Sequence, residues 1–262
     1  MRARVIDWDA PWFRAVAERG RAVEGVRDAR SALSAVASRL GLRNAGGRPI
    51  RFAAPEAAGG AAYEEHIHRT GEVPTRDNLH DFFNALVWLA FPRAKAGLNA
   101  LQAAAIARDG VGPRRGALRD AATLIDENSV LLVTQRDDLV EALAAHDWRR
   151  LFVADRAAWR SEVRAIVFGH ALMEKLTAPY RGVTAHALHV RLAADAALAA
   201  IDAAVAAALD EGLAPSRLRP LPVLGIPGWA DNDDAAYYDD ASVFRPERRA
   251  RALEDRLSES RP

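Results

Sequence analysis

Two short stretches of the sequence carry side chains that could do chemistry together. The first, TRDNLHDFFNALVWLAFPRAKAGLNALQ from Thr75 to Gln102, places histidine, carboxylate, amide and ammonium groups among bulky apolar residues. A histidine can act as a base or bind a metal near neutral pH, and a carboxylate can orient it or share the metal. This stretch therefore predicts a polar pocket lined by His80, Asp81, Asn84 and Lys95.

The second stretch, GHALMEK, places His170 and Glu174 one helical turn apart. At this spacing both side chains lie on one face of a helix and can bind one divalent metal. Gly169 directly before His170 indicates that another part of the chain approaches the backbone closely there. We expect both stretches to face one pocket. A divalent metal is the candidate cofactor, and its candidate ligands are His80, His170 and Glu174.

These residues support two hypotheses of different class. In the first, the protein is an enzyme of hydrolase type, and Lys95 or Arg93 binds an anionic small molecule. In the second, the protein is a non-catalytic binding protein, and the same polar groups form a buried hydrogen-bond network. Adjacent residues on a helix point about 100° apart, so His80 and Asp81 need not serve one site.

Other polar groups are weaker candidates. Asp126, Glu127 and Asn128 resemble metal ligands, but the sequence around them predicts a hairpin turn, where such residues are expected from backbone chemistry alone. His66 and His68 share a face only in an extended segment. His186 and His189 share a face only in a helix.

The composition excludes several classes of protein. The 262 residues contain no cysteine, which excludes disulfides, cysteine-ligated metals and a thiol nucleophile. The sequence also lacks the glycine-rich nucleotide loops, the serine-hydrolase elbow, the HExxH metalloprotease motif and the calcium loop. A net charge of +1, from 36 basic and 35 acidic residues, gives no nucleic-acid signal. No apolar run reaches the roughly 18 residues of a membrane span. We expect a cytoplasmic location.

Hydrophobic periodicity and turn residues predict the elements that must position these groups. Leu79, Phe82, Phe83, Leu86 and Ala90 form one apolar face of a central helix, and Pro92 either kinks this helix or opens a second one. The other predicted elements are a helix from Ala10 to about Leu40, capped by Asp9 and interrupted near Gly20 and Gly25, a strand at Ile50 to Ala53, a β-hairpin pairing Ala122 to Ile125 with Val130 to Thr134, a short helix at Leu139 to His146, a largely helical stretch from Trp148 to about Thr177, and a helix at Ala193 to Leu209.

Residues 215–246 differ in character from the rest. They are rich in proline, glycine and aromatic residues and show little periodicity, which predicts an extended arm that packs on the body. Residues 247–262 form a charged tail that we expect to be frayed. The sequence thus predicts an α+β fold, mainly α, with one compact domain over residues 1–246, a central helix, one short β-hairpin and an extended C-terminal arm.

Four phrases of the sequence occur together in a known bacterial family. They are LHDFFNALVWLAFPRAKAGLN, RDAATLIDEN, FGHALMEKLTAPY and LGIPGW with the later VFRP. Over roughly Tyr63 to Pro246 the chain resembles the family catalogued as domain of unknown function three thousand and twenty-five. The resemblance implies that these segments belong to one fold, and it supplies no catalytic residues.

Overall fold

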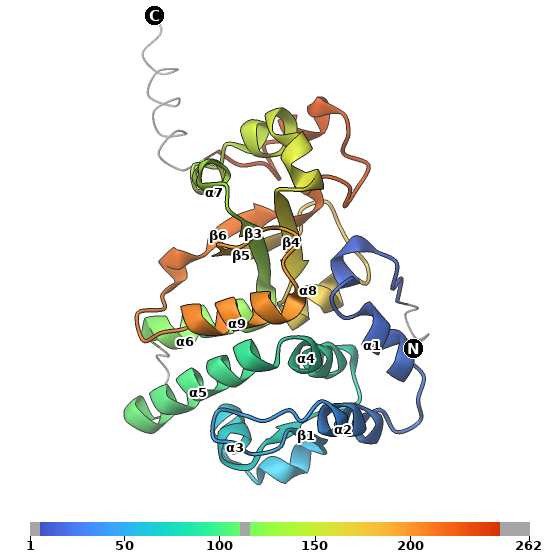
Figure 1. Ribbon diagram of the computed structural model, residues 1–262, viewed down its shortest axis with the longest axis vertical. Helices are drawn as coiled ribbons and strands as arrows, with labels where there is room; N and C mark the ends of the chain where they lie inside the picture. Colours follow the sequence, from blue (N-terminus) through green and yellow to red (C-terminus); the bar gives the residue numbers. More distant parts are fainter. Residues whose placement is uncertain (1–5, 111–115, 247–262) are drawn as a thin grey trace, which may run out of the picture.

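A four-stranded sheet forms the centre of the upper half of the molecule (Figure 1). The computed structural model describes residues 6–110 and 116–246. In the sheet, β3 pairs with β4 antiparallel and with β5 parallel, and β6 pairs with β5 antiparallel, so the order is β4-β3-β5-β6. Every residue of β3 is buried, as expected for a central strand. The strands are β3 (Ser129–Thr134), β4 (Val163–Val167), β5 (Thr184–Val190) and β6 (Arg219–Pro222).

Helices cover one end of this sheet and join it to a smaller lower layer (Figure 1). The joining helices are α4 (Leu79–Ala90), α5 (Pro92–Asp109), α6 (Gly116–Asn128), α8 (His170–Lys175) and α9 (Leu198–Ala208). The lower layer contains α2 (Ala29–Arg39), α3 (Tyr63–Thr70) and the parallel pair β1 (Arg51–Ala53) and β2 (Glu72–Pro74). The remaining helices are α1 (Ala17–Val23), α7 (Asp137–Ala144), η1 (Pro11–Phe13), η2 (Pro55–Ala58), η3 (Arg150–Ala154), η4 (Arg156–Arg160), η5 (Pro215–Arg217), η6 (Val223–Gly225) and η7 (Ala235–Asp239).

The α4–α5 junction shows how the chain bends at Pro92. The proline takes the first position of α5, where no backbone N–H is needed. Of the two predicted alternatives, Pro92 therefore opens a second helix. The next two backbone N–H groups, of Arg93 and Ala94, donate to the Asp202 carboxylate at 3.0 and 2.8 Å. Asp202 thus caps α5 from α9. The α4 helix is buried along almost its whole length, so it is the central helix that the apolar spacing predicted.

The α+β, mainly α fold class is confirmed, but three predicted elements are wrong. The β-hairpin does not form, because Ala122 to Ile125 lie inside α6 and the following strand pairs with β4 and β5. Short apolar runs fit a strand or a helix equally well, and only long-range pairing decides between them. Residues 148–177 are not one helical stretch, because the β-branched run of β4 interrupts them. Asp9 does not cap a helix: Ala10 is the N-cap residue of η1, and Asp9 pairs with Arg21 at 2.5 Å.

The last described residues, 215–246, return to the sheet and then pack on the body. β6 adds the edge strand, and the rings of Tyr238 and Phe244 are buried with their centroids 5.0 Å apart. Tyr238 also donates its hydroxyl to the Gly225 carbonyl at 2.9 Å. The tail at residues 247–262 lies outside the described residues. Among the described residues, no helix combines the length and the apolar character that a bilayer crossing needs.

Candidate metal centre

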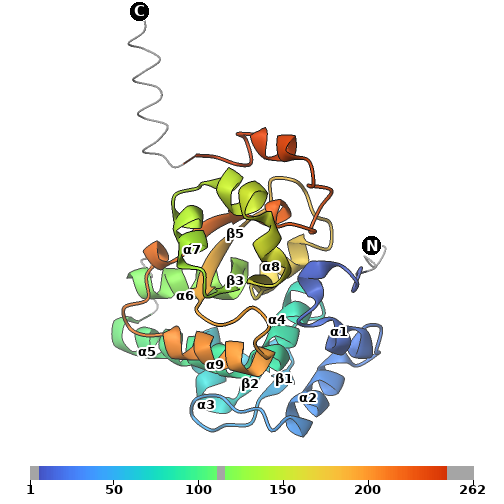
Figure 2. The same cartoon turned by 45° about the horizontal axis from the view of Figure 1, so that its top comes forward.

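Helix α4 packs on α8 (Figure 2). Two histidines from distant parts of the chain meet at this contact. Asn78 caps α4 by accepting from the Asp81 N–H at 2.8 Å, which places His80 in the first turn. His170 is the first residue of α8. Their Nε2 atoms are 3.1 Å apart, and the two rings meet edge to face with centroids 4.5 Å apart. The two stretches that the sequence analysis singled out therefore face each other.

The carboxylate of Glu127, in the last turn of α6, completes a group of three. Its Oε2 lies 3.4 Å from Nε2 of His170 and 3.8 Å from Nε2 of His80. Ligand atoms roughly 2.0–2.1 Å from a tetrahedral ion are about 3.3 Å from one another. The three atoms, all within 4.8 Å of one another, thus approach the spacing that one metal ion requires.

A second carboxylate lies behind each histidine ring. Oε2 of Glu174 is 3.3 Å from Nδ1 of His80, and Oδ2 of Asp126 is 3.9 Å from Nδ1 of His170. Metal-bound histidines commonly donate the other ring N–H to such a carboxylate, which fixes the tautomer and the ring orientation. Glu174 was expected as a ligand. The structure places it on the outer side of His80, and it places Glu127 on the inner side.

Burial determines the protonation state of the inner histidine. The pKa of His170 is lowered to about 4: burial lowers it most, the Asp126 carboxylate opposes this, and the charges of Lys95 and His80 act in the same direction as burial. The ring is therefore neutral at pH 7, as a metal ligand must be. Burial also raises the pKa of the Glu127 carboxyl, with Asp126 acting in the same direction and His80 against it.

Gly169 permits this arrangement by leaving room for the end of α6. A Cβ atom at this position would lie under 3.0 Å from backbone atoms of Glu127, Asn128 and Ser129. The Gly169 N–H donates to the Ser129 carbonyl at 3.0 Å, which ties the two segments together. The close approach predicted from the sequence is confirmed, and it is what brings His170 beside Glu127.

Replacing Gly169 by alanine should therefore both destabilise the protein and disturb the centre. Overpacking against backbone costs about 1–3 kcal/mol. Gly182→Ala is the matched control, because its added Cβ would lie 3.7 Å from the nearest side-chain atom of Tyr180. Urea unfolding and zinc titration of both variants provide the measurement. Equal stability and equal zinc affinity of the two variants would contradict the prediction.

Lys95 lies in a buried network directly behind the centre. Its ammonium donates to Oδ1 of Asn84 at 2.8 Å and to Asp126, and it lies 5.5 Å from the ring centroid of Trp88. Asn84 in turn donates to the Tyr63 hydroxyl at 2.9 Å. Burial raises the pKa of Asp126, but Lys95 and His170 lower it by more, so Asp126 is ionised. Lys95 is thus held by fixed partners.

Glu64 extends this network toward α5. Its carboxylate accepts from Asn99 at 2.7 Å and from Gln102 at 3.3 Å. Burial raises the pKa of Glu64 to about 7, with Asp126 acting in the same direction and Lys95 against it. Asn99 and Gln102 lie three residues apart on α5, so they share the helical face that meets Glu64.

Glu64 should make stability depend on pH. Between its ordinary pKa of 4.5 and about 7, the folded protein holds a proton that the unfolded chain releases, so the free energy of unfolding falls as pH rises. Glu64→Gln should remove this pH dependence. Relative to the wild type, the variant should therefore be more stable at pH 8 than at pH 5, by about 1–3 kcal/mol. Urea unfolding at both pH values tests this, with the exposed Glu65→Gln as control. An unaltered pH dependence in Glu64→Gln would refute it.

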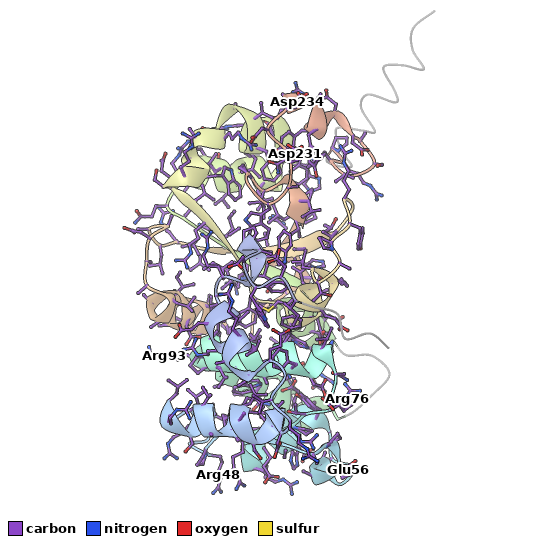
Figure 3. All side chains as sticks on the ribbon, turned by 90° about the vertical axis from the view of Figure 1, so that its right-hand side faces the viewer. Arg48, Glu56, Arg76, Arg93, Asp231 and Asp234 are labelled. Carbon is purple, nitrogen blue, oxygen red and sulfur yellow. The ribbon has the colours of Figure 1, made fainter. Side chains whose placement is uncertain are left out.

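The other expected residues lie elsewhere. The Asp81 carboxylate is bound by Arg76, at 2.9 Å from Nε, and Figure 3 shows Arg76 at the surface. His186 and His189 lie on β5, three residues apart, so they point to opposite faces of the sheet. His66 is buried on α3 and lies 3.6 Å from Glu72. Of the six expected site residues, His80, His170 and Glu174 therefore converge, Asn84 and Lys95 lie behind them, and Asp81 lies apart.

Comparison with known proteins identifies the family. A family model described as "Protein of unknown function (DUF3025)" matches residues 50–248. The chain belongs to this family. No curated protein and no solved structure matches the chain. The DUF3025 range contains every residue of the histidine–glutamate group and of the network behind it, whereas η1 and α1 precede it.

Proposed function

We propose that this DUF3025 protein is a metal-dependent hydrolase that binds one divalent cation through His80, Glu127 and His170. The observation that carries the proposal is the geometry of the two rings. Their Nε2 atoms lie 3.1 Å apart beside the Glu127 carboxylate, and each Nδ1 faces a further carboxylate. A hydrogen-bonded histidine pair alone would need no third group on the Nε2 side.

The donor set favours zinc. Two imidazoles and one carboxylate are the protein ligands of several zinc hydrolases, in which the fourth position holds water. Imidazole suits zinc, whereas magnesium and calcium prefer an all-oxygen environment. A bound zinc ion would lower the pKa of its water to about 7 and so supply hydroxide at neutral pH.

The exposure of the side chains indicates where a substrate would enter. The side chains of His80 and Glu127 are 31% and 38% exposed, whereas that of His170 is 4% exposed. Solvent therefore reaches the group from the side of His80 and Glu127. Asp126 and Lys95 lie on the opposite, buried side, where they do not touch a substrate.

Lys175 is a better candidate than Lys95 for binding an anionic substrate. It is exposed, and its ammonium donates to Asn128 at 3.3 Å, next to Glu127 in the sequence. Its charge lowers the pKa of Glu127, so the two groups are close. Arg93, the other expected cation, lies at the start of α5, and Figure 3 shows its side chain at the surface. The cytoplasmic location stays a prediction.

Metal analysis by mass spectrometry tests the proposal. The protein is purified without a chelator and without a histidine tag, and we expect one zinc ion per chain. Chelation should release the ion and abolish hydrolysis of small ester or phosphoester substrates, and added zinc should restore it. Protein that retains no transition metal and binds none in a titration would refute the proposal.

A further inference from the structure

A cavity lies beside the edge strand β4, apart from the histidine–glutamate group. Its volume is about 250 Å³. One wall is the strand itself, the second is η1 with Arg14 and Ala15, and the third is the turn at residues 226–229. η1 contacts β4, and Figure 1 shows the N-terminal segment on that side of the sheet. None of the residues that line the cavity belongs to the proposed metal centre.

Two arginines without an acidic partner line this cavity. Within residues 6–110 and 116–246, neither Arg14 nor Arg164 forms an ion pair. Within the described part of the chain, the Arg164 guanidinium donates one hydrogen bond, to the Ala196 carbonyl at 3.2 Å. Burial, and next the charge of Arg14, lower the pKa of Arg164, so the two guanidinium groups are close enough to repel each other. Most arginines elsewhere in the sheet half have carboxylate partners, for example Arg136 with Asp138 and Arg191 with Asp137.

Tryptophan rings supply the rest of the lining. Trp12, Trp159 and Trp229 all face the cavity, and the rings of Trp12 and Trp229 meet edge to face at 6.1 Å. The indole N–H of Trp159 is satisfied by the Leu151 carbonyl at 2.8 Å. That of Trp12 is buried and has no hydrogen-bond partner within the described residues. A buried donor of this kind is uncommon unless a ligand or water accepts from it.

We propose that this cavity binds a small planar molecule that carries one oxyanion, an aromatic carboxylate or an aryl phosphate. The oxyanion lies between Arg14 and Arg164, because the guanidinium fork matches carboxylate and phosphate oxygens. The ring lies against the tryptophan faces, where an apolar planar body is favoured. Drug-sized ligands occupy about 300–1,000 Å³, so a cavity of this volume selects a smaller molecule of one ring.

Binding of benzoate, phenyl phosphate and benzamide to the full chain tests this proposal. The readout is the intrinsic tryptophan fluorescence together with the melting temperature. We expect one or both anions to bind and benzamide, which has the same ring but no charge, to bind at least about tenfold more weakly. A preference for benzoate assigns a carboxylate, and a preference for phenyl phosphate assigns a phosphate ester.

Three variants test whether the two arginines hold the oxyanion. Arg164→Gln and the exposed Arg14→Gln should each weaken anion binding about tenfold or more. Arg27→Gln, on an exposed loop, is the control and should bind like the wild type. Zinc content should be unchanged in all three, so this proposal and the proposed function can fail independently. The proposed anion site is overturned if benzamide binds as tightly as the anions, if neither anion binds at millimolar concentration, or if both Arg14→Gln and Arg164→Gln bind the anions like the wild type.

Discussion

Replacing His80 by alanine should abolish zinc binding and leave the free energy of unfolding nearly unchanged. His80 contributes one of the three atoms on the Nε2 side of the group, and its side chain is partly exposed, so its loss leaves little cavity. Loss of an outer carboxylate lowers metal affinity about 10–100-fold, and loss of a direct ligand should exceed this. Zinc affinity by competition with a chromogenic chelator and stability by urea unfolding, measured on the same protein, provide the test.

Two further variants make the assignment of ligands specific. Glu174→Gln should weaken zinc binding only about 10–100-fold, because Glu174 lies behind His80 and does not face Nε2 of His170. His186→Ala removes a histidine that contacts Asn128 outside the group, so zinc affinity should not change. If His80→Ala instead lowers stability by about 1–3 kcal/mol and retains zinc affinity, the histidines serve the fold and not a metal.

The sequence located the histidines because helical spacing is a local property. His80 lies in a helix with a clear apolar face, and His170 lies one turn before Glu174. In both cases residues three or four positions away were enough to predict a helix and a polar face. Gly169 added a third signal, since a glycine before a helix indicates a close approach. The contact between the His80 and His170 segments is a long-range tertiary contact, which local spacing suggested but could not establish.

Glu127 ranked only as a weaker candidate ligand for a related reason. Three adjacent polar residues between two apolar runs predict a turn, and a turn would place the carboxylates at an exposed tip. In the structure α6 continues through these residues, so Asp126 points inward to Lys95 and Glu127 points to the histidines. Whether a short apolar run becomes a helix or a strand depends on its partners: here β3 has neighbours on both sides and needs no hairpin.

Replacing Lys95 by methionine should destabilise the protein more than any single change at the metal centre. Lys95 is 4% exposed, and its ammonium pairs with the Asp126 carboxylate, whose other basic neighbour, His170, is neutral at pH 7. Removing one member of a buried pair leaves the other charge uncompensated, which costs about 3–5 kcal/mol. Lys175→Met, on the exposed side of the same site, should change stability by less than about 0.5 kcal/mol.

The double variant Lys95→Met with Asp126→Leu shows whether the uncompensated charge is the cause. Replacing both members of a buried pair by apolar residues of similar volume is often neutral, so the double variant should recover most of the stability that the single variant loses. Zinc affinity should not recover with it, because the carboxylate behind Nδ1 of His170 is then missing. Urea unfolding and zinc titration of the two variants measure these effects separately. If stability does not recover, Lys95 acts through its hydrogen bond to Asn84 and its contact with Trp88, and the Lys95–Asp126 pair is not what holds α5 to α6.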